Sequence, residues 1–210
     1  MKNKVCYFGL DISTSIVGFC LINYKKDLVL LDYIDLRKTK CMFKKSELVK
    51  EKLLSFKKNY DFADSVNISI EEAFQSFSKG FSSAKTLSQL SRFNGIVSYQ
   101  CYEVFNSVPV YINVNSARKN LQIKINKKLN INTKEQVFQW TQNNIKNFNW
   151  PMKTLKSGPN KGVVKFHECC YDMSDAYVIC KALIYNYENN NQWKNKFSRK
   201  LFKHIIIKRW

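Results

Sequence analysis

The chain has 210 residues, of which 45% are hydrophobic, enough to build the core of one domain. Its 35 Lys and Arg residues against 16 Asp and Glu leave a formal net charge of +19, which favours a polyanionic partner, most simply nucleic acid. No apolar stretch approaches the roughly 20 residues needed to cross a bilayer, and no signal-peptide pattern opens the chain. We therefore expect a soluble intracellular protein, cytoplasmic or nuclear, with no membrane partner.

Three strands are predicted at the start of the chain, from β-branched and aromatic content, over residues 4–12, 16–24 and 27–36. A tight turn, "STS", joins the first two, so we expect the chain to open as an antiparallel meander. Helical spacing of apolar residues follows over 43–59, and a fourth strand over 65–74 carries two glutamates.

The second half alternates predicted helices with one more strand. The expected elements are a helix over 83–105, a strand over 108–114, helices over 116–123 and 132–145, a loop region over 147–168 and a helix over 171–187. Asn115 or Ser116 is expected to cap the second of these helices, and Asn132 or Thr133 the third. This order predicts one α/β sheet with helices on both faces. We expect a domain over 1–190 and a basic tail over 191–210.

Acidic residues stand where the predicted strands end and the last helix begins: Asp11, Glu71, Glu72, Asp172 and Asp175. Pleating sends Glu71 and Glu72 to opposite faces, so only one can join a site, whereas Asp172 and Asp175 share a helix face. Converging carboxylates repel one another unless Mg²⁺ or Mn²⁺ binds them. In so basic a chain, this pattern indicates phosphodiester cleavage by two metal ions.

A zinc site is the competing interpretation of the stretch "FHECC". His167, Cys169 and Cys170 could supply half of such a site, but no C-x-x-C pair accompanies them, and the other histidine, His204, is far along the chain. The seven cysteines, an odd number, are expected to be free thiols. Zinc is therefore not predicted.

Four motifs together resemble one family. "GLDISTSIVG", "ISIEEAF", "NSARKNLQ" with "NTKEQV", and "DMSDAYVI" occur in the order found in RuvC-like Holliday junction resolvases and span residues 8–179. The resemblance implies an RNase H-like fold: a five-stranded mixed sheet, with strands 1–3 antiparallel and strands 4 and 5 parallel, flanked by helices. It also implies roles for single residues. The implied catalytic, metal-binding acids are Asp11, Glu71, Asp172 and Asp175, and the implied DNA-binding residues are Phe74, Arg118, Lys119 and Lys134.

The chain departs from the family pattern at two points. A second family lysine falls on Leu121, and the spacing from Glu71 to Asp172 is longer than in the family, with extra residues around "QIKINKKLNIN" and "KTLKSGPNKGVVKFHECC". These insertions could be added DNA-binding loops, or they could mark a relative with altered substrate choice.

The resemblance implies a homodimeric endonuclease that nicks four-way (branched) DNA symmetrically with two Mg²⁺ ions, for which Mn²⁺ can substitute, leaving 5′-phosphate and 3′-hydroxyl ends. The long helix over 83–105 is the expected dimer face. "GLDISTSIVG" also resembles the phosphate loop of sugar-kinase and actin-like ATPases, but those need two such domains, so no nucleotide cofactor is expected. Two alternatives stay open: an RNase H-fold nuclease that cuts flaps, forks or RNA, and a noncatalytic DNA-binding protein.

Overall fold

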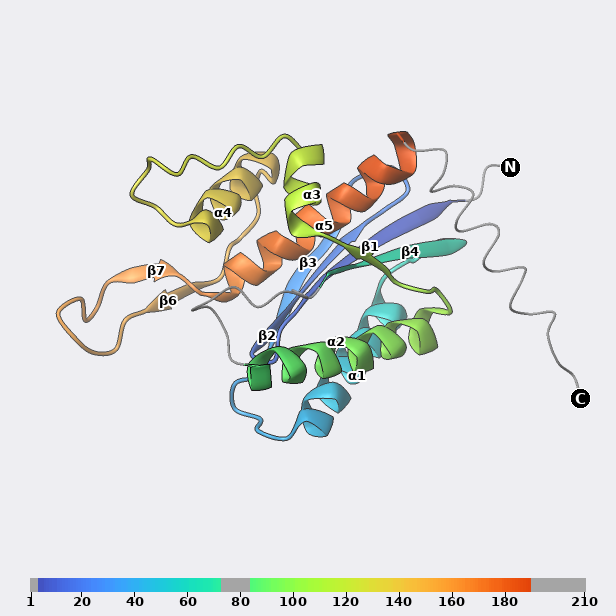
Figure 1. Cartoon of the computed structure of the whole chain (residues 1–210), viewed down its shortest axis with the longest axis horizontal. Coiled ribbons are helices and arrows are strands. Elements are labelled where there is room, and N and C mark those ends of the chain that lie inside the picture. Colours follow the sequence, from blue (N-terminus) through green and yellow to red (C-terminus); the bar gives the residue numbers. More distant parts are fainter. Residues whose placement is uncertain (1–3, 73–83, 190–210) are drawn as a thin grey trace, which may run out of the picture.

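The computed structural model describes residues 4–72 and 84–189, which form a mixed sheet with helices on both faces (Figure 1). The sheet has five strands: β1 (Val5–Ile12), β2 (Ile16–Ile22), β3 (Leu28–Asp35), β4 (Ser65–Glu71) and β5 (Val110–Ile112). Their order is β3-β2-β1-β4-β5. The first three strands are antiparallel, and β4 and β5 run parallel to β1. This is the RNase H-like sheet that was predicted.

The helices form one layer on each side of the sheet (Figure 1). One layer holds α1 (Met42–Asn59) and α2 (Ala84–Phe105). The other holds α5 (Cys169–Asn189) with α3 (Val114–Asn120) and α4 (Thr133–Asn144). Within the described ranges, no helix is both long and apolar enough to cross a membrane.

Strand alternation builds two separate cores. In β1, Phe8 and Leu10 point into the core beneath α1 and α2, whereas Tyr7 points into the core beneath α5. Because successive side chains of a strand point to opposite faces, Gly9 and Asp11 lie on the same face as Tyr7. The face covered by α5 is therefore the one that carries the aspartate.

The region predicted as a loop over 147–168 contains a β-hairpin, which is a correction. Its strands are β6 (Met152–Thr154) and β7 (Val164–Phe166), paired antiparallel. The Gly and Pro residues that indicated a loop form the connection between these strands, where Gly158 and Gly162 adopt positive φ angles. Strands of three residues are too short to show a two-residue alternation in the sequence.

Two further expectations, the end of the fourth strand and the cap of α3, differ from the structure. The strand predicted over 65–74 ends at Glu71, and Phe74 lies outside the described residues, as does the basic tail. The cap of α3 is Asn113, whose side chain accepts hydrogen bonds from the backbone N–H groups of Asn115 and Ser116, so the expected cap at Asn115 or Ser116 was wrong. Asn132 caps α4, as expected.

Candidate metal centre

Two of the predicted acids meet at the ends of adjacent parallel strands. In the register of β1 and β4, Leu10 pairs with Ile70, so the next residues along each strand, Asp11 and Glu71, come side by side. The carboxyl ends of parallel strands lie at the same edge of a sheet, and this pairing therefore places both carboxylates at one point.

Two glycines let α5 approach the sheet closely beside Asp11. Gly18 is the cross-strand partner of Asp11, and a Cβ atom there would lie 2.1 Å from the carbonyl oxygen of Asp172. At Gly9, a Cβ would lie 2.5 Å from the carbonyl oxygen of Ala176. Because real Cβ atoms essentially never come this close to backbone, α5 can occupy its position only where these two residues lack a side chain.

The close approach brings a third carboxylate to the pair. Carboxylate oxygens of Asp11, Glu71 and Asp175 all lie within 4.8 Å of one another. The side chain of Asp175 is buried, and its Oδ1 has no hydrogen-bond partner among the described residues. Asp172, one turn earlier on α5, lies outside this group of three but close enough to repel Asp11 and Asp175.

Burial and mutual repulsion disfavour the charged forms of these acids. Burial, followed by repulsion from Glu71 and Asp175, holds the pKa of Asp11 well above its usual range. Burial is also the main cause that raises the pKa of Glu71 to about 7 and that of Asp172 to about 6. Burial raises the pKa of Asp175 as well. Among the described residues, burial and mutual repulsion thus shift all four carboxyl groups toward their neutral forms.

Two basic side chains oppose this repulsion. A guanidinium nitrogen of Arg118, on α3, lies 4.0 Å from Asp175 Oδ1, too far for a hydrogen bond. Lys134 opens α4, where the Asn132 cap and a 2.6 Å hydrogen bond from the Tyr171 hydroxyl to Glu135 fix the helix beside α5. Burial lowers the pKa of Lys134, but the surrounding carboxylates raise it more, so the net shift is upward.

The residues present fit a divalent cation. Three carboxylates offer oxygen ligands from two strands and a helix, which is the donor set that Mg²⁺ and Mn²⁺ prefer. Asp175 Oδ1 and Arg118 Nε are both buried without a hydrogen-bond partner in the described part of the chain. Because a buried polar atom without a partner is costly, a bound cation would satisfy the oxygen that Arg118 does not reach.

Three other residues considered in the sequence are not among the close carboxylates of this cluster. Lys119 is exposed on α3, and Glu72, next to Glu71, is not one of the three close carboxylates. His167 stacks against Tyr33 with ring centroids 5.9 Å apart. The sequence did not predict that Arg37 acts on the site. Its positive charge lowers the pKa of Asp172, as the weakest of the effects in that direction, and its guanidinium forms an ion pair with Asp35. Nothing in the stretch around Arg37 could have signalled this.

Comparison with known proteins places this geometry on a known fold. No protein-family model matches the chain, and no curated protein matches its sequence. Among solved structures, Thermus thermophilus RuvC in complex with a Holliday junction substrate matches over 89% of this chain and 96% of its own, with 12% identity and a TM-score of 0.58. A second Thermus thermophilus RuvC structure matches over 87% and 95%, with 13% identity and a TM-score of 0.51. The chain has the fold of RuvC.

The RuvC likeness covers nearly the whole of both chains. A further match is the yeast mitochondrial Holliday junction resolvase Ydc2, at 8% identity over 94% of this chain and 84% of that one, with a TM-score of 0.46. At such identities the RuvC structures establish the fold alone.

Proposed function

We propose that the chain is a metal-dependent endonuclease that resolves four-way DNA junctions. The observation that carries this proposal is the cluster of Asp11, Glu71 and Asp175, which could hold metal ions and has the geometry described above on a RuvC fold. The net charge of +19 supports a polyanionic substrate. Thermus thermophilus RuvC was solved with a Holliday junction, and we extend that substrate class to this chain.

In the proposed reaction, water adds to the phosphorus and the bond from phosphorus to the 3′ oxygen breaks. The water oxygen stays on the 5′-phosphate, and the 3′ oxygen leaves as a hydroxyl. Asp11, Glu71 and Asp175 would hold Mg²⁺ or Mn²⁺, with Asp172 beside them as a fourth ligand. Two bound ions would supply activation of the water and stabilisation of the leaving oxygen.

The basic residues have separate roles in this proposal. Lys134 lies near all four acids, where its ammonium offsets their charge and can meet a non-bridging phosphate oxygen. Arg118 keeps Asp175 next to a positive charge. Lys119 is exposed on the same helix as Arg118 and would contact the DNA backbone.

The test is a cleavage panel with Mg²⁺ or Mn²⁺ that compares a four-way junction with a fork, a flap, a duplex and an RNA–DNA hybrid. We expect paired nicks in the junction. Asp11→Asn and Glu71→Gln should abolish cleavage and keep junction binding, whereas Glu72→Gln, the neighbour outside the cluster, should cleave normally. If a flap, fork or hybrid were cut in preference to the junction, the protein would be a nuclease of different substrate choice. If no substrate were cut, the proposal that the protein is an enzyme would be wrong.

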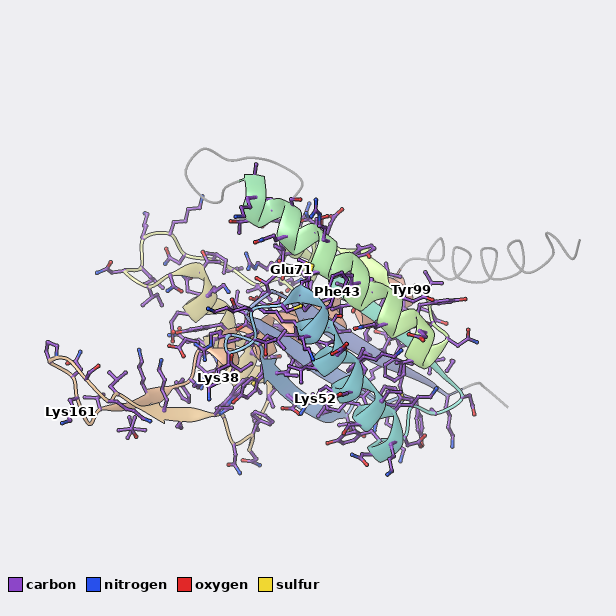
Figure 2. All side chains as sticks on the ribbon, turned by 90° about the horizontal axis from the view of Figure 1, so that it is seen from below. Lys38, Phe43, Lys52, Glu71, Tyr99 and Lys161 are labelled. Carbon is purple, nitrogen blue, oxygen red and sulfur yellow. The ribbon has the colours of Figure 1, made fainter. Side chains whose placement is uncertain are left out.

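We further propose a homodimer, because symmetric nicking of a junction needs two sites. The proposed contact face is α2, where Tyr99 is 64% exposed and lies near the exposed Tyr102, with ring centroids 6.5 Å apart (Figure 2). Exposed aromatic pairs of this kind are typical of interface centres. Tyr99→Lys should lower the mass measured by light scattering from two chains to one, whereas the same mass in both proteins would exclude this face.

A further inference from the structure

The β6–β7 hairpin projects from the molecule on the side where α5 begins (Figure 1). Lys161 lies at its far end (Figure 2). The connection between the strands is closed by backbone hydrogen bonds, from Leu155 N–H to Val163 O at 3.0 Å and from Gly162 N–H to Leu155 O at 2.9 Å. The two strands are thus paired from their base as far as Leu155 and Gly162, which gives the hairpin a defined direction.

The base of the hairpin is fixed to the helices beside the metal centre. The Phe166 ring packs edge-on against Phe138 of α4, with centroids 4.9 Å apart. The backbone N–H of His167 donates to the carbonyl of Pro151 at 2.9 Å, and Lys153 forms an ion pair with Glu168, next to the start of α5. A ligand held on the hairpin is therefore held at a fixed place relative to α5 and its acids.

The charge of the hairpin is unbalanced. Residues 147–167 contain four lysines and no acidic residue. Lys153 and Lys165 pair directly across the two strands, an arrangement that is destabilising for like charges. Glu168 offsets Lys153 alone, and within residues 4–72 and 84–189 no ion pair involves Lys156, Lys161 or Lys165, all three of which are exposed.

From these observations we infer that the β6–β7 hairpin binds the sugar-phosphate backbone of a duplex DNA arm that leaves the metal centre. The inference rests on the proposed function, because it assumes the same DNA substrate. Repeated phosphates suit a row of unpaired lysines, and a two-stranded ribbon is narrow enough for the major groove of B-DNA. At about 3.3 Å per residue, the paired stretch from Met152 to Leu155 spans roughly 10 Å, or about three base pairs of an arm.

A second basic segment supports the choice of a long polyanion. The loop between α3 and α4 carries exposed Lys124, Lys127 and Lys128 and projects from the same side of the molecule as the hairpin in both views (Figures 1 and 2). Between Val104 and Lys134 the sequence has no acidic residue. The two basic segments lie on either side of α4 in Figure 1, so a duplex could contact both, whereas a small anion could not.

The experiment compares the double variant K161A/K165A with K25A/K58A, which removes the same charge from exposed lysines elsewhere on the domain. Junction and duplex binding is measured in EDTA over a range of salt concentrations. We expect K161A/K165A to reduce the salt slope by about 2 and to weaken binding about twentyfold at 0.2 M salt, because each lost phosphate contact removes about 0.9 from the slope. K25A/K58A should bind as the wild type does. A photo-crosslinker at position 161 should label DNA, and one at position 58 should not.

The outcomes separate this inference from the proposed function. Equal binding by K161A/K165A and K25A/K58A, with cleavage by the wild type intact, would overturn the hairpin inference alone. Weaker DNA binding by K161A/K165A in a protein that cleaves nothing would support the hairpin and overturn the nuclease. The inference names duplex DNA as the ligand of the hairpin. It would therefore also be overturned if K161A/K165A lost affinity for double-stranded RNA or for anionic vesicles but bound DNA as the wild type does.

Discussion

Gly18→Ala is expected to damage the metal centre without touching any of its acids. The added Cβ would lie 2.1 Å from the carbonyl oxygen of Asp172, where ordinary contacts begin at 3.4 Å, and the next contacts are also backbone atoms of α5. No flexible side chain can give way, so α5 must retreat by about 1 Å. Overpacking of this kind costs about 1–3 kcal/mol, which lowers the melting temperature of a domain of this size by roughly 2–12 °C.

The larger effect is expected on the site. A displacement of about 1 Å in a catalytic group can cost about a hundredfold in rate, so G18A should lose most of its cleavage and its stabilisation by Mn²⁺ while it still folds. The matched control is Gly95→Ala in α2, where the added Cβ meets nothing of the same chain within 4 Å and should stabilise the helix by about 0.5–1 kcal/mol. Because α2 is also the proposed dimer face, both glycine variants are compared in the Tyr99→Lys background. Thermal melts in EDTA and in Mn²⁺ check both. If G18A melted like the wild type and kept its Mn²⁺ shift, the close approach of α5 would not be what assembles the cluster.

For other changes in the same cluster, the structure predicts whether stability or Mn²⁺ affinity rises or falls. In EDTA, Asp11→Asn should raise the melting temperature, because it replaces a half-buried carboxyl group whose charged form is disfavoured by burial and by its acidic neighbours. A 100-fold excess of Mn²⁺ over its dissociation constant should stabilise the wild type by about 2.7 kcal/mol and D11N much less. The pKa of Glu71, about 7 in the folded protein, lies above its unfolded value of about 4.3, so its contribution to stability is full below pH 4 and is lost as the pH rises through 7. Melts without metal should therefore show wild type falling relative to Glu71→Gln between pH 5 and 8, and a constant difference would contradict the burial of Glu71. Arg118→Met should tighten Mn²⁺ binding severalfold in titration calorimetry without DNA, because it removes a positive charge 4.0 Å from Asp175. An unchanged Mn²⁺ affinity would mean that the charge of Arg118 does not act on the bound ion.

The positions of the strands and the acids at the ends of β1 and β4 follow from local sequence patterns, because strand period and strand ends are local properties. The mixed sheet and the choice of Glu71 over Glu72 came from the family resemblance. The sequence could not separate Asp172 from Asp175, since spacing of three puts both on one helix face. Which of them joins the group of three depends on how α5 rotates and tilts over β1 and β2, and that is decided by close packing against Gly9 and Gly18. Helix packing of this kind joins residues far apart in the chain, where local patterns carry no information.

The same reason explains what was missed. Gly9 and Gly18 stand in the first motif of the sequence, but only the position of α5 shows that neither of them can carry a side chain. The family resemblance implied a DNA contact for Arg118, whereas its approach to Asp175 follows from the packing of Ala117 into the core beneath α5. The β6–β7 hairpin escaped detection because its strands are three residues long and its connection is rich in Gly and Pro.

The position of α5 also has a consequence for the order in which the protein is made. Glu71 and Asp175 are separated by roughly a hundred residues, which a ribosome adds in about 5–20 s. During that interval Asp11 and Glu71 can already pair in the sheet, but the cluster lacks its third carboxylate, and the core on that face has no cover. A nascent chain therefore holds two acids and no complete cation site until α5 docks. The capacity to bind metal in this geometry arises late, in the same step that closes the second core.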